Sequence, residues 1–318
     1  FAIHIDGAPT PYMQSDRSRV IRIGVQAMQI DDEERKDAAL TFVIDTSGSM
    51  RQDHRLELVK DALALLVDEL SPDDTVAIVE YGTNARVVLE PTSAEDRRTI
   101  LRAIDRLEQK GSTNAAAGLQ LGYQLADEVF LRHGTNRVIL CSDGVANIGI
   151  TGADGILELI REDARTGIQL LTVGVGMDNY NDLLMEQLAN NGDGFYAYVD
   201  NIDEAERLFV DDLTGTLQTV ASDARIQVEF DAESVESWRL IGFENRAIDD
   251  EDFRDDSVDA GEIGSGHTVT ALYEVELTRQ AARGRLTDIG TVSLRWIDPD
   301  LGRPQELAQT FSTADFAE

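Results

Sequence analysis

The sequence predicts an α/β protein with a doubly wound, mostly parallel sheet, inserted in an antiparallel β-sandwich. Between Ala39 and Val220, short apolar runs alternate with longer segments of helical period, which is typical of βα units. Beyond this region the pattern changes to period-two strands separated by acidic turns, and residues 20–25 share that alternation. We therefore expect an α/β domain over residues 37–219 and a discontinuous β-sandwich domain formed by residues 1–36 and 220–318.

Four apolar runs in the first region are expected to be its central strands. Continuous apolar character favours strands that are covered on both faces of a sheet. The runs are residues 40–44, 76–79, 137–141 and 168–173. In the second region, strands are expected at residues 225–230, 238–241, 269–277 and 291–296.

The segments between the central strands carry the apolar stripe of a helix. In residues 56–70, apolar side chains recur at helical spacing, and Ser71-Pro72 ends the pattern. Gly118 and Gly122, four residues apart on another expected helix, predict close packing on the sheet. The further helices are expected over residues 94–107, 115–131, 153–166, 181–190 and 203–217.

Composition narrows the classes of function. The 318 residues include 28 Lys and Arg against 60 Asp and Glu, a formal net charge of −32 at pH 7. Such a surface repels nucleic-acid phosphates and anionic lipid headgroups, and no apolar run reaches the length of a membrane span. The single cysteine, Cys141, excludes an intrachain disulfide and a multi-thiolate metal site. We expect no nucleic-acid partner, no membrane insertion of this segment, and oxygen or nitrogen ligands for any metal.

Three polar loops are predicted to meet at one edge of the α/β sheet. Asp45-Thr46-Ser47-Gly48-Ser49 follows the first strand, Ser142-Asp143 ends the third, and Gly111-Ser112-Thr113-Asn114 begins a helix. In an open parallel sheet, ligands bind beyond the carboxyl ends of the strands. Carboxylate and hydroxyl oxygens suit Mg²⁺, which prefers octahedral oxygen coordination. A simpler interpretation of the first loop is a turn in which Ser49 or Asp53 caps the following helix.

Enzymatic interpretations are disfavoured by the residues themselves. A phosphoaspartyl hydrolase needs a second carboxylate where Ser47 stands, because that group acts as acid and base. Neither Ser47 nor Ser49 lies in the Gly-x-Ser-x-Gly pattern of a nucleophilic serine. None of the four histidines occupies a clear catalytic position.

Together, these loops resemble the von Willebrand factor type A family and its metal-ion-dependent adhesion site. The family motif is D-x-S-x-S followed by a distant Thr and a distant Asp. It is matched by Asp45, Ser47, Ser49, Thr113 and Asp143. More narrowly, the chain looks like a bacterial branch in which this Rossmann-like domain is joined to an uncharacterised C-terminal β domain, a likeness supported by residues 179–182 and 259–267.

The resemblance implies a binding site for a metal ion and a protein partner. It implies Mg²⁺, with Mn²⁺ or Ca²⁺ as substitutes, and serine hydroxyls that bind the ion directly. Two carboxylates balance a divalent ion and leave it able to accept a further carboxylate. We therefore expect non-enzymatic, metal-dependent binding of a protein that supplies an Asp or Glu side chain.

Two other functions stay open at this point. One is an interaction subunit of a larger intracellular complex, such as one with a chaperone-like ATPase. The less favoured one is a metal-dependent hydrolase. We expect a cell-envelope or extracellular location, with a cytoplasmic one as the alternative, and any signal or anchoring segment would precede Phe1.

Two further segments hold potential cation ligands, and both fit simpler roles. Residues 249–262 contain eight carboxylates but lack the EF-hand pattern, so a solvated acidic loop is expected. The second segment has residues typical of turns and helix caps. Its members are Asp178, Asn179, Asn181 and Asp182.

Overall fold

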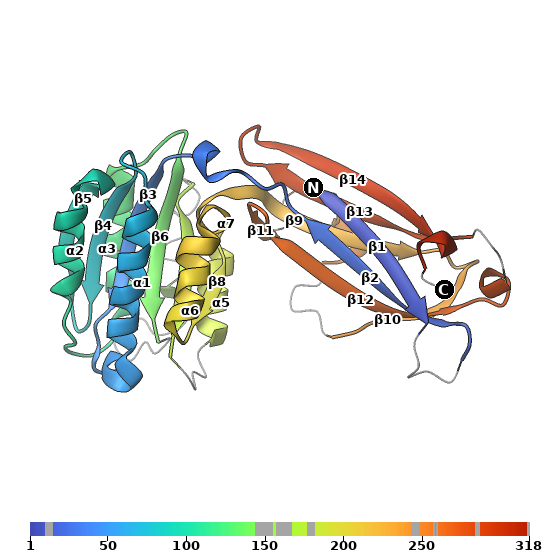
Figure 1. The fold of residues 1–318 in the computed structure, drawn as a ribbon, viewed down its shortest axis with the longest axis horizontal. Coiled ribbons are helices and arrows are strands. Elements are labelled where there is room, and N and C mark those ends of the chain that lie inside the picture. Colours follow the sequence, from blue (N-terminus) through green and yellow to red (C-terminus); the bar gives the residue numbers. More distant parts are fainter. Residues whose placement is uncertain are drawn as a thin grey trace. The chain divides into compact units, whose positions relative to one another are not determined.

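The chain forms two compact units in the computed structural model (Figure 1). One unit is Phe1–Ile30 together with Thr219–Glu318, and the other is Asp31–Gln218. The chain leaves the first unit after Ile30 and returns at Thr219, so the second unit is an insertion. The structure describes residues 1–9, 15–143, 155–156, 167–176, 182–242, 248–256, 258, 260–283 and 287–316.

The inserted unit contains a six-stranded sheet in the order β5-β4-β3-β6-β7-β8. Its strands are β3 (Ala38–Asp45), β4 (Thr75–Tyr81), β5 (Ala85–Ser93), β6 (Thr135–Ser142), β7 (Gln169–Val175) and β8 (Tyr196–Val199). Neighbouring strands are parallel except β4 and β5, which form an antiparallel pair. The predicted doubly wound, mostly parallel sheet is confirmed.

Two strands of this sheet, β5 and β8, were not predicted from the sequence. Both lie at the edges of the sheet, where strands are less buried than the central ones, and β8 is only four residues long. β5 contains Arg86, Glu90 and Pro91. Proline is tolerated there because an edge strand needs hydrogen bonds on one side only.

The helices of the unit follow the predicted apolar stripes, with one correction. They are α1 (Arg55–Glu69), α2 (Arg97–Asp105), α3 (Ala115–Glu128), α5 (Asp182–Asn191), α6 (Ile202–Glu206) and α7 (Leu213–Leu217). The single helix expected over residues 203–217 is wrong, because a π-helical turn (Arg207–Asp211) separates α6 from α7. Phe209 of this turn packs in the same core as α1, and the helix that follows, α7, is only five residues long. Apart from residues 155–156, the helix expected over 153–166 lies outside the described residues.

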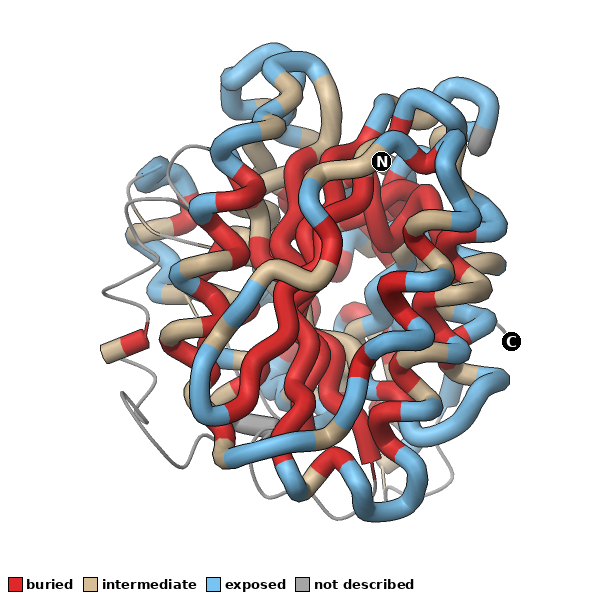
Figure 2. Tube along the Cα trace, turned by 90° about the vertical axis from the view of Figure 1, so that its left-hand side faces the viewer, coloured by how far each residue is buried: buried red, intermediate tan, exposed pale blue. Residues whose placement is uncertain are grey.

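Helices cover both faces of the sheet, and Figure 2 shows the buried strands between them. Every residue of β3 is buried, and successive side chains point to opposite faces. Phe42 and Ile44 share a core with α1, whereas Val43 shares one with α3. Gly118 and Gly122 allow the close approach of α3 that was predicted, since a Cβ atom at Gly122 would lie 2.4 Å from a methyl group of Val43.

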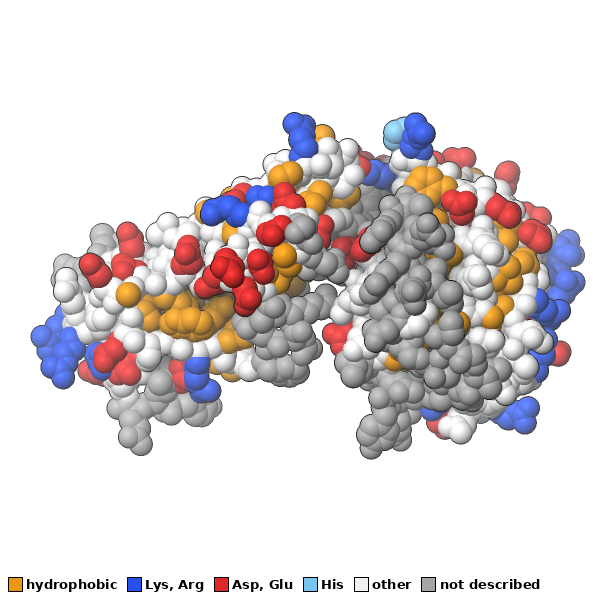
Figure 3. Space-filling model, turned by 180° about the vertical axis from the view of Figure 1, so that it is seen from behind, with side chains coloured by type: hydrophobic (Ala, Val, Ile, Leu, Met, Phe, Trp, Pro, Cys, Tyr) orange, Lys and Arg blue, Asp and Glu red, His pale blue; other side chains and the backbone are white. Residues whose placement is uncertain are grey.

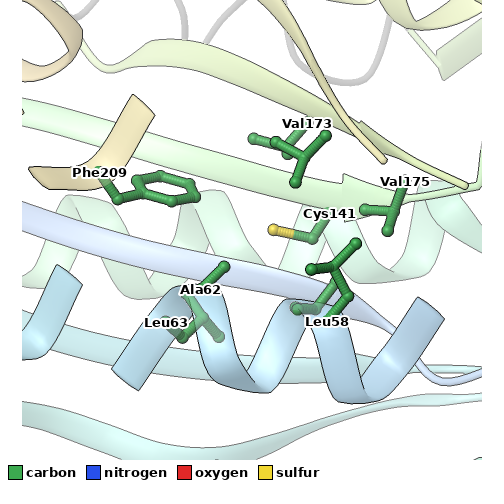
Figure 4. A pocket seen from close by; sticks show the side chains of 9 residues that line it. Leu58, Ala62, Leu63, Cys141, Val173, Val175 and Phe209 are labelled. Carbon is green, nitrogen blue, oxygen red and sulfur yellow. The ribbon is translucent and has the colours of Figure 1, made fainter. Parts of the chain in front are cut away.

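Cys141 lies in the core between α1 and the sheet. Its side chain borders a cavity of about 10 Å³ that is lined by apolar side chains (Figure 4). Burial raises the pKa of the thiol to about 12. The residue therefore packs as a small apolar group and is a poor nucleophile. No helix within the described part of the chain is long and apolar enough to cross a membrane.

The other unit is a β-sandwich of two four-stranded antiparallel sheets, ordered β1-β2-β12-β10 and β11-β9-β13-β14. The strands are β1 (Ala2–Pro9), β2 (Ser18–Gln26), β9 (Thr219–Phe230), β10 (Val235–Leu240), β11 (Gly261–Gly264), β12 (Thr268–Leu277), β13 (Asp288–Asp298) and β14 (Arg303–Ser312). Ile21 and Ile23 of β2 belong to the same core as Val292 and Phe311 of the facing sheet. The N-terminal segment thus supplies an interior strand, since β2 pairs with both β1 and β12.

Candidate metal-binding site

The predicted motif residues lie in loops at the carboxyl edge of the α/β sheet. Asp45 is the last residue of β3, Asp143 follows β6, and Thr113 precedes α3. β3 and β6 are parallel neighbours, with Ile44 opposite Cys141. The chain passes from β3 to β4 on one side and later to β6 on the other, so the strand order reverses between β3 and β6. Such a reversal is the usual place for a ligand crevice in an open α/β sheet.

Asp45, Ser47 and Ser49 form one hydrogen-bonded turn. The backbone nitrogen of Ser47 donates to Oδ1 of Asp45 at 2.8 Å, and the Ser47 and Ser49 hydroxyl oxygens are 2.9 Å apart. The capping interpretation of this loop is wrong, because His54 occupies the N-cap position of α1 and makes no capping hydrogen bond. The two serine hydroxyls thus contact each other and do not cap the helix.

Backbone hydrogen bonds fix the serine loop and the Thr113 loop to each other and to the turn at Gly82. The nitrogen of Gly48 donates to the Gly111 carbonyl at 3.1 Å, and that of Asn114 donates to the Gly82 carbonyl at 2.9 Å. Glycine is required at two of these positions. A Cβ atom at Gly82 would lie 2.4 Å from the Lys110 carbonyl oxygen, and Gly111 has a φ of 83°. The loop that carries Thr113 is thus tied to the loop that carries the serines.

Asp45 is fully buried and hydrogen-bonded from two sides. Ser142 donates to its Oδ2 at 2.9 Å, and the Tyr81 hydroxyl donates to the same atom at 3.4 Å. Burial raises the pKa of this carboxyl to about 6, because a low-dielectric surrounding disfavours the charged form. Hydrogen bonds from Ser47 and Ser142 lower the pKa, while the charge of Asp143 raises it. The ionised carboxylate would be stabilised by a nearby cation.

Arg55 is a site residue that the sequence did not predict. It begins α1, yet only 8% of its side chain is exposed, and Nη1 donates to Oδ2 of the buried Asp143 at 3.0 Å. Gly176, directly after β7, makes room for it, because a Cβ atom there would lie 2.1 Å from Nε of Arg55. The sequence feature that could have indicated Arg55 is its position, at the start of an apolar helix next to the polar loop.

This donor set fits a hard divalent cation. Its members are the carboxylates of Asp45 and Asp143 and the hydroxyls of Ser47, Ser49 and Thr113. Two carboxylates buried this close together destabilise each other's ionised forms unless positive charge compensates them. Within the described ranges, no three His, Cys, Asp or Glu side chains come together at a metal position, so hydroxyls would have to complete the shell. Neutral hydroxyl oxygens are acceptable ligands for Mg²⁺.

The chain matches the family model of the von Willebrand factor type A domain over residues 39–211. It belongs to the von Willebrand factor type A family. Residues 215–316 match a second family model, described as the C-terminal part of the uncharacterized protein YfbK. The predicted combination of a von Willebrand factor type A domain with a C-terminal domain of unknown role is thereby confirmed.

Two relatives of this von Willebrand factor type A protein are described as uncharacterized proteins. YfbK of Escherichia coli is 39% identical over 282 residues, which cover 89% of this chain and 49% of the relative. An uncharacterized protein of Synechocystis sp. is 31% identical over 203 residues, covering 64% of this chain and 46% of the relative. The chain thus spans about half the length of these two relatives.

A solved structure supports the fold over the whole chain. The von Willebrand factor type A protein from Catenulispora acidiphila superimposes with a TM-score of 0.54 and 16% identity, covering 98% of this chain and 72% of that one. At this identity, the likeness concerns the fold alone.

The acidic segment after β10 is organised around an arginine of the sandwich unit. The guanidinium of Arg225 donates to the backbone carbonyls of Asp252, Asp255 and Val258 at 3.0, 2.8 and 2.7 Å. These bonds hold the described part of the segment against β9. The other potential cation segment is not described: Asp178, Asn179 and Asn181 and the side chain of Asp182 lie outside the described residues.

The sandwich unit of this von Willebrand factor type A protein has a hollow that the sequence did not predict. Its volume is about 400 Å³. Trp238, on its wall, is 56% exposed, and its ring centroid is 6.0 Å from that of Tyr273. Figure 3 shows apolar side chains gathered on one face of this unit with acidic side chains beside them. The hollow is lined by Arg225, Ile226, Gln227, Val228, Trp238, Leu240, Ile248, Asp249, Asp250, Phe253, Ala271 and Tyr273.

Proposed function

We propose that this chain is a non-enzymatic protein-binding module whose α/β domain holds Mg²⁺ and presents it to a carboxylate of a partner protein. Mn²⁺ or Ca²⁺ would substitute for Mg²⁺. The observation that carries the proposal is the pair of buried carboxylates, Asp45 and Asp143, beside hydroxyls whose loops are fixed by backbone hydrogen bonds. Membership of a family commonly used for protein–protein interaction supports it.

The charges of the ligands explain why a carboxylate is the expected partner group. Bound Mg²⁺ supplies a hard, electrophilic centre. Asp45 and Asp143 balance its two positive charges, and the hydroxyl ligands add none. A shell of four or five carboxylates would satisfy the ion and repel an acidic partner. The hydroxyls of Ser47, Ser49 and Thr113 therefore favour a site that still accepts an Asp or Glu side chain.

The same residues argue against catalysis. Ser47 and Ser49 hydrogen-bond with each other, whereas a nucleophilic serine needs a base as its partner. Position 47 also lacks the second carboxylate of a phosphoaspartyl hydrolase. The described geometry thus supports holding a cation better than forming a covalent intermediate.

Calorimetric titration of Mg²⁺ into the wild type and into Ser47→Ala/Ser49→Ala tests the proposal. We expect saturable binding by the wild type and affinity weaker by roughly tenfold or more in the variant, because two proposed ligands are lost. Thr291→Ala/Thr310→Ala is the matched control. It also removes two neighbouring hydroxyls, whose oxygens are 3.4 Å apart, but they lie in the sandwich unit. Identical binding by all three proteins would reject the metal site.

A further inference from the structure

We propose that Arg55 sets the charge of this site, weakening its hold on the metal and strengthening its preference for an anionic partner group. The inference rests on the proposed function. Arg55 lies outside the five-residue motif, but its guanidinium pairs directly with Asp143. It is therefore a specificity-determining residue of the site.

The ion pair is too deeply buried to be a surface contact. The side chain of Arg55 is 8% exposed and that of Asp143 is 0% exposed, with 3.0 Å between Nη1 and Oδ2. Solvent and salt screen a buried pair much less than an exposed one. The positive charge of Arg55 therefore acts on any ion or ligand that binds beside Asp143.

The absence of a side chain at Gly176 leaves space for the Arg55 guanidinium at the sheet edge. Gly176 follows β7, has a φ of 98°, and leaves no room for a side chain beside Nε and Cδ of Arg55. Arg55 itself begins α1, directly after the 3₁₀ helix (Gly48–His54) that continues from the serine loop. Its position is thus set by β6, β7 and the serine loop together, the elements that form this side of the site.

The net charge of the site changes sign when a divalent ion binds. Asp45, Asp143 and Arg55 together carry one negative charge, and one divalent ion turns this into one positive charge. Without Arg55, the corresponding values are two negative charges and zero. Arg55 therefore opposes metal binding electrostatically and favours a subsequent anion. Its removal should change the two affinities in opposite directions.

Arg55→Met tests this prediction, because it removes the charge and keeps a flexible apolar stem. We expect Mn²⁺ to bind roughly tenfold more tightly, and acetate to bind the Mn²⁺-loaded protein roughly tenfold more weakly. Arg55→Lys, which keeps the charge, should lie much closer to the wild type in both measurements. A merely structural role would weaken both affinities in Arg55→Met and would not be rescued by lysine.

Two spectroscopic readouts separate the affinities. Electron paramagnetic resonance of free Mn²⁺ gives metal binding. Water proton relaxation of the Mn²⁺-loaded protein during acetate titration gives anion binding, since acetate displaces metal-bound water. Ionic strength is held constant with sodium chloride, so that only the acetate concentration changes during the titration.

Arg98→Met is the matched control for a lost positive charge. Arg98 is exposed on α2, shortly after the end of β5. The last residue of β5, Ser93, pairs with Thr75, the first residue of β4. This end of the sheet is opposite the edge that carries the metal site. We expect both affinities of Arg98→Met to match the wild type. If Arg55→Met does not fold, as judged by circular dichroism, Arg55→Gln provides the same loss of charge with a polar side chain.

The outcomes distinguish this inference from the proposed function. Opposite shifts in Arg55→Met, absent from Arg98→Met, support it. If the wild type binds Mn²⁺ but the two affinities of Arg55→Met shift in the same direction, or not at all, the inference alone is overturned. A wild type that binds no Mn²⁺ overturns the proposed function and the inference with it.

Discussion

Asp45 and Asp143 stand at the ends of two neighbouring parallel strands, and both carboxylates are fully buried. Burial is the main cause that raises the pKa of Asp45, and the charge of Asp143 adds to it, so the value is about 6 against an ordinary 3.8. The folded protein thus binds a proton at Asp45 more tightly than the unfolded chain does. This relationship gives the site a measurable pH dependence.

In the absence of divalent ions, ionisation of Asp45 should destabilise the protein. Protonated Asp45 contributes to the free energy of unfolding in full below about pH 4. This contribution is lost as the pH rises to about 6, a decrease of roughly 3 kcal/mol. Asp45→Asn removes this titration. We expect thermal unfolding in EDTA to show Asp45→Asn gaining stability relative to the wild type across that pH range. The exposed Asp61→Asn on α1 should show a flat difference, and an equally flat one for Asp45→Asn would contradict the assignment.

Gly82 and Gly48 offer a matched pair that tests how the loops are fixed. A Cβ atom at Gly82 would lie 2.4 Å from the Lys110 carbonyl oxygen, whereas one at Gly48 would meet only the Gly111 oxygen at 3.7 Å, an ordinary contact. We expect Gly82→Ala to lose roughly 1–3 kcal/mol of stability and to bind Mg²⁺ more weakly, because the Thr113 loop must move. Chemical denaturation and calorimetry measure the two effects. Gly48→Ala should stay near the wild type in both.

The sequence predicts those parts of the fold and site that depend on neighbouring residues, and misses those that depend on residues far apart in the chain. β3 and β6 were predicted because strands buried on both faces need continuous apolar residues, and the motif loops followed from their ends. β5 was missed because an edge strand tolerates Arg86 and Pro91. Arg55 was missed because its burial depends on Gly176, which is distant in the sequence and meets it only in the folded sheet.

Asp74 should be one of the main stabilising residues at the opposite edge of the sheet. It is fully buried, pairs with Arg35 at 2.6 Å, and accepts hydrogen bonds from the backbone nitrogens of Ala38 and Ser71 at 2.7 and 2.8 Å. Asp74→Ala leaves all three donors without this acceptor, so we expect a loss of about 3–5 kcal/mol in chemical denaturation. Asp73→Ala removes the exposed neighbouring carboxylate and should change stability by less than about 0.5 kcal/mol. Similar losses in both variants would show that the Asp74 contacts are unimportant.

Ile23 tests whether the N-terminal segment is part of the sandwich core. It is 0% exposed on β2, and lies opposite Ile5 on one side and Ala271 on the other. Ile23→Ala should cost about 2–5 kcal/mol, because it leaves a cavity between the sheets. Both tryptophans of the chain, Trp238 and Trp296, belong to the sandwich unit, so their fluorescence reports its unfolding.

Leu66→Ala is the counterpart of Ile23→Ala in the other unit, because Leu66 is 0% exposed on α1. The longer helices of the described chain belong to the α/β unit, so far-ultraviolet circular dichroism reports chiefly on that unit. We expect Ile23→Ala to lower mainly the temperature of the fluorescence transition, and Leu66→Ala mainly that of the circular dichroism transition, since each unit has its own core. Equal shifts of both signals in both variants would mean that the two cores unfold as one cooperative structure.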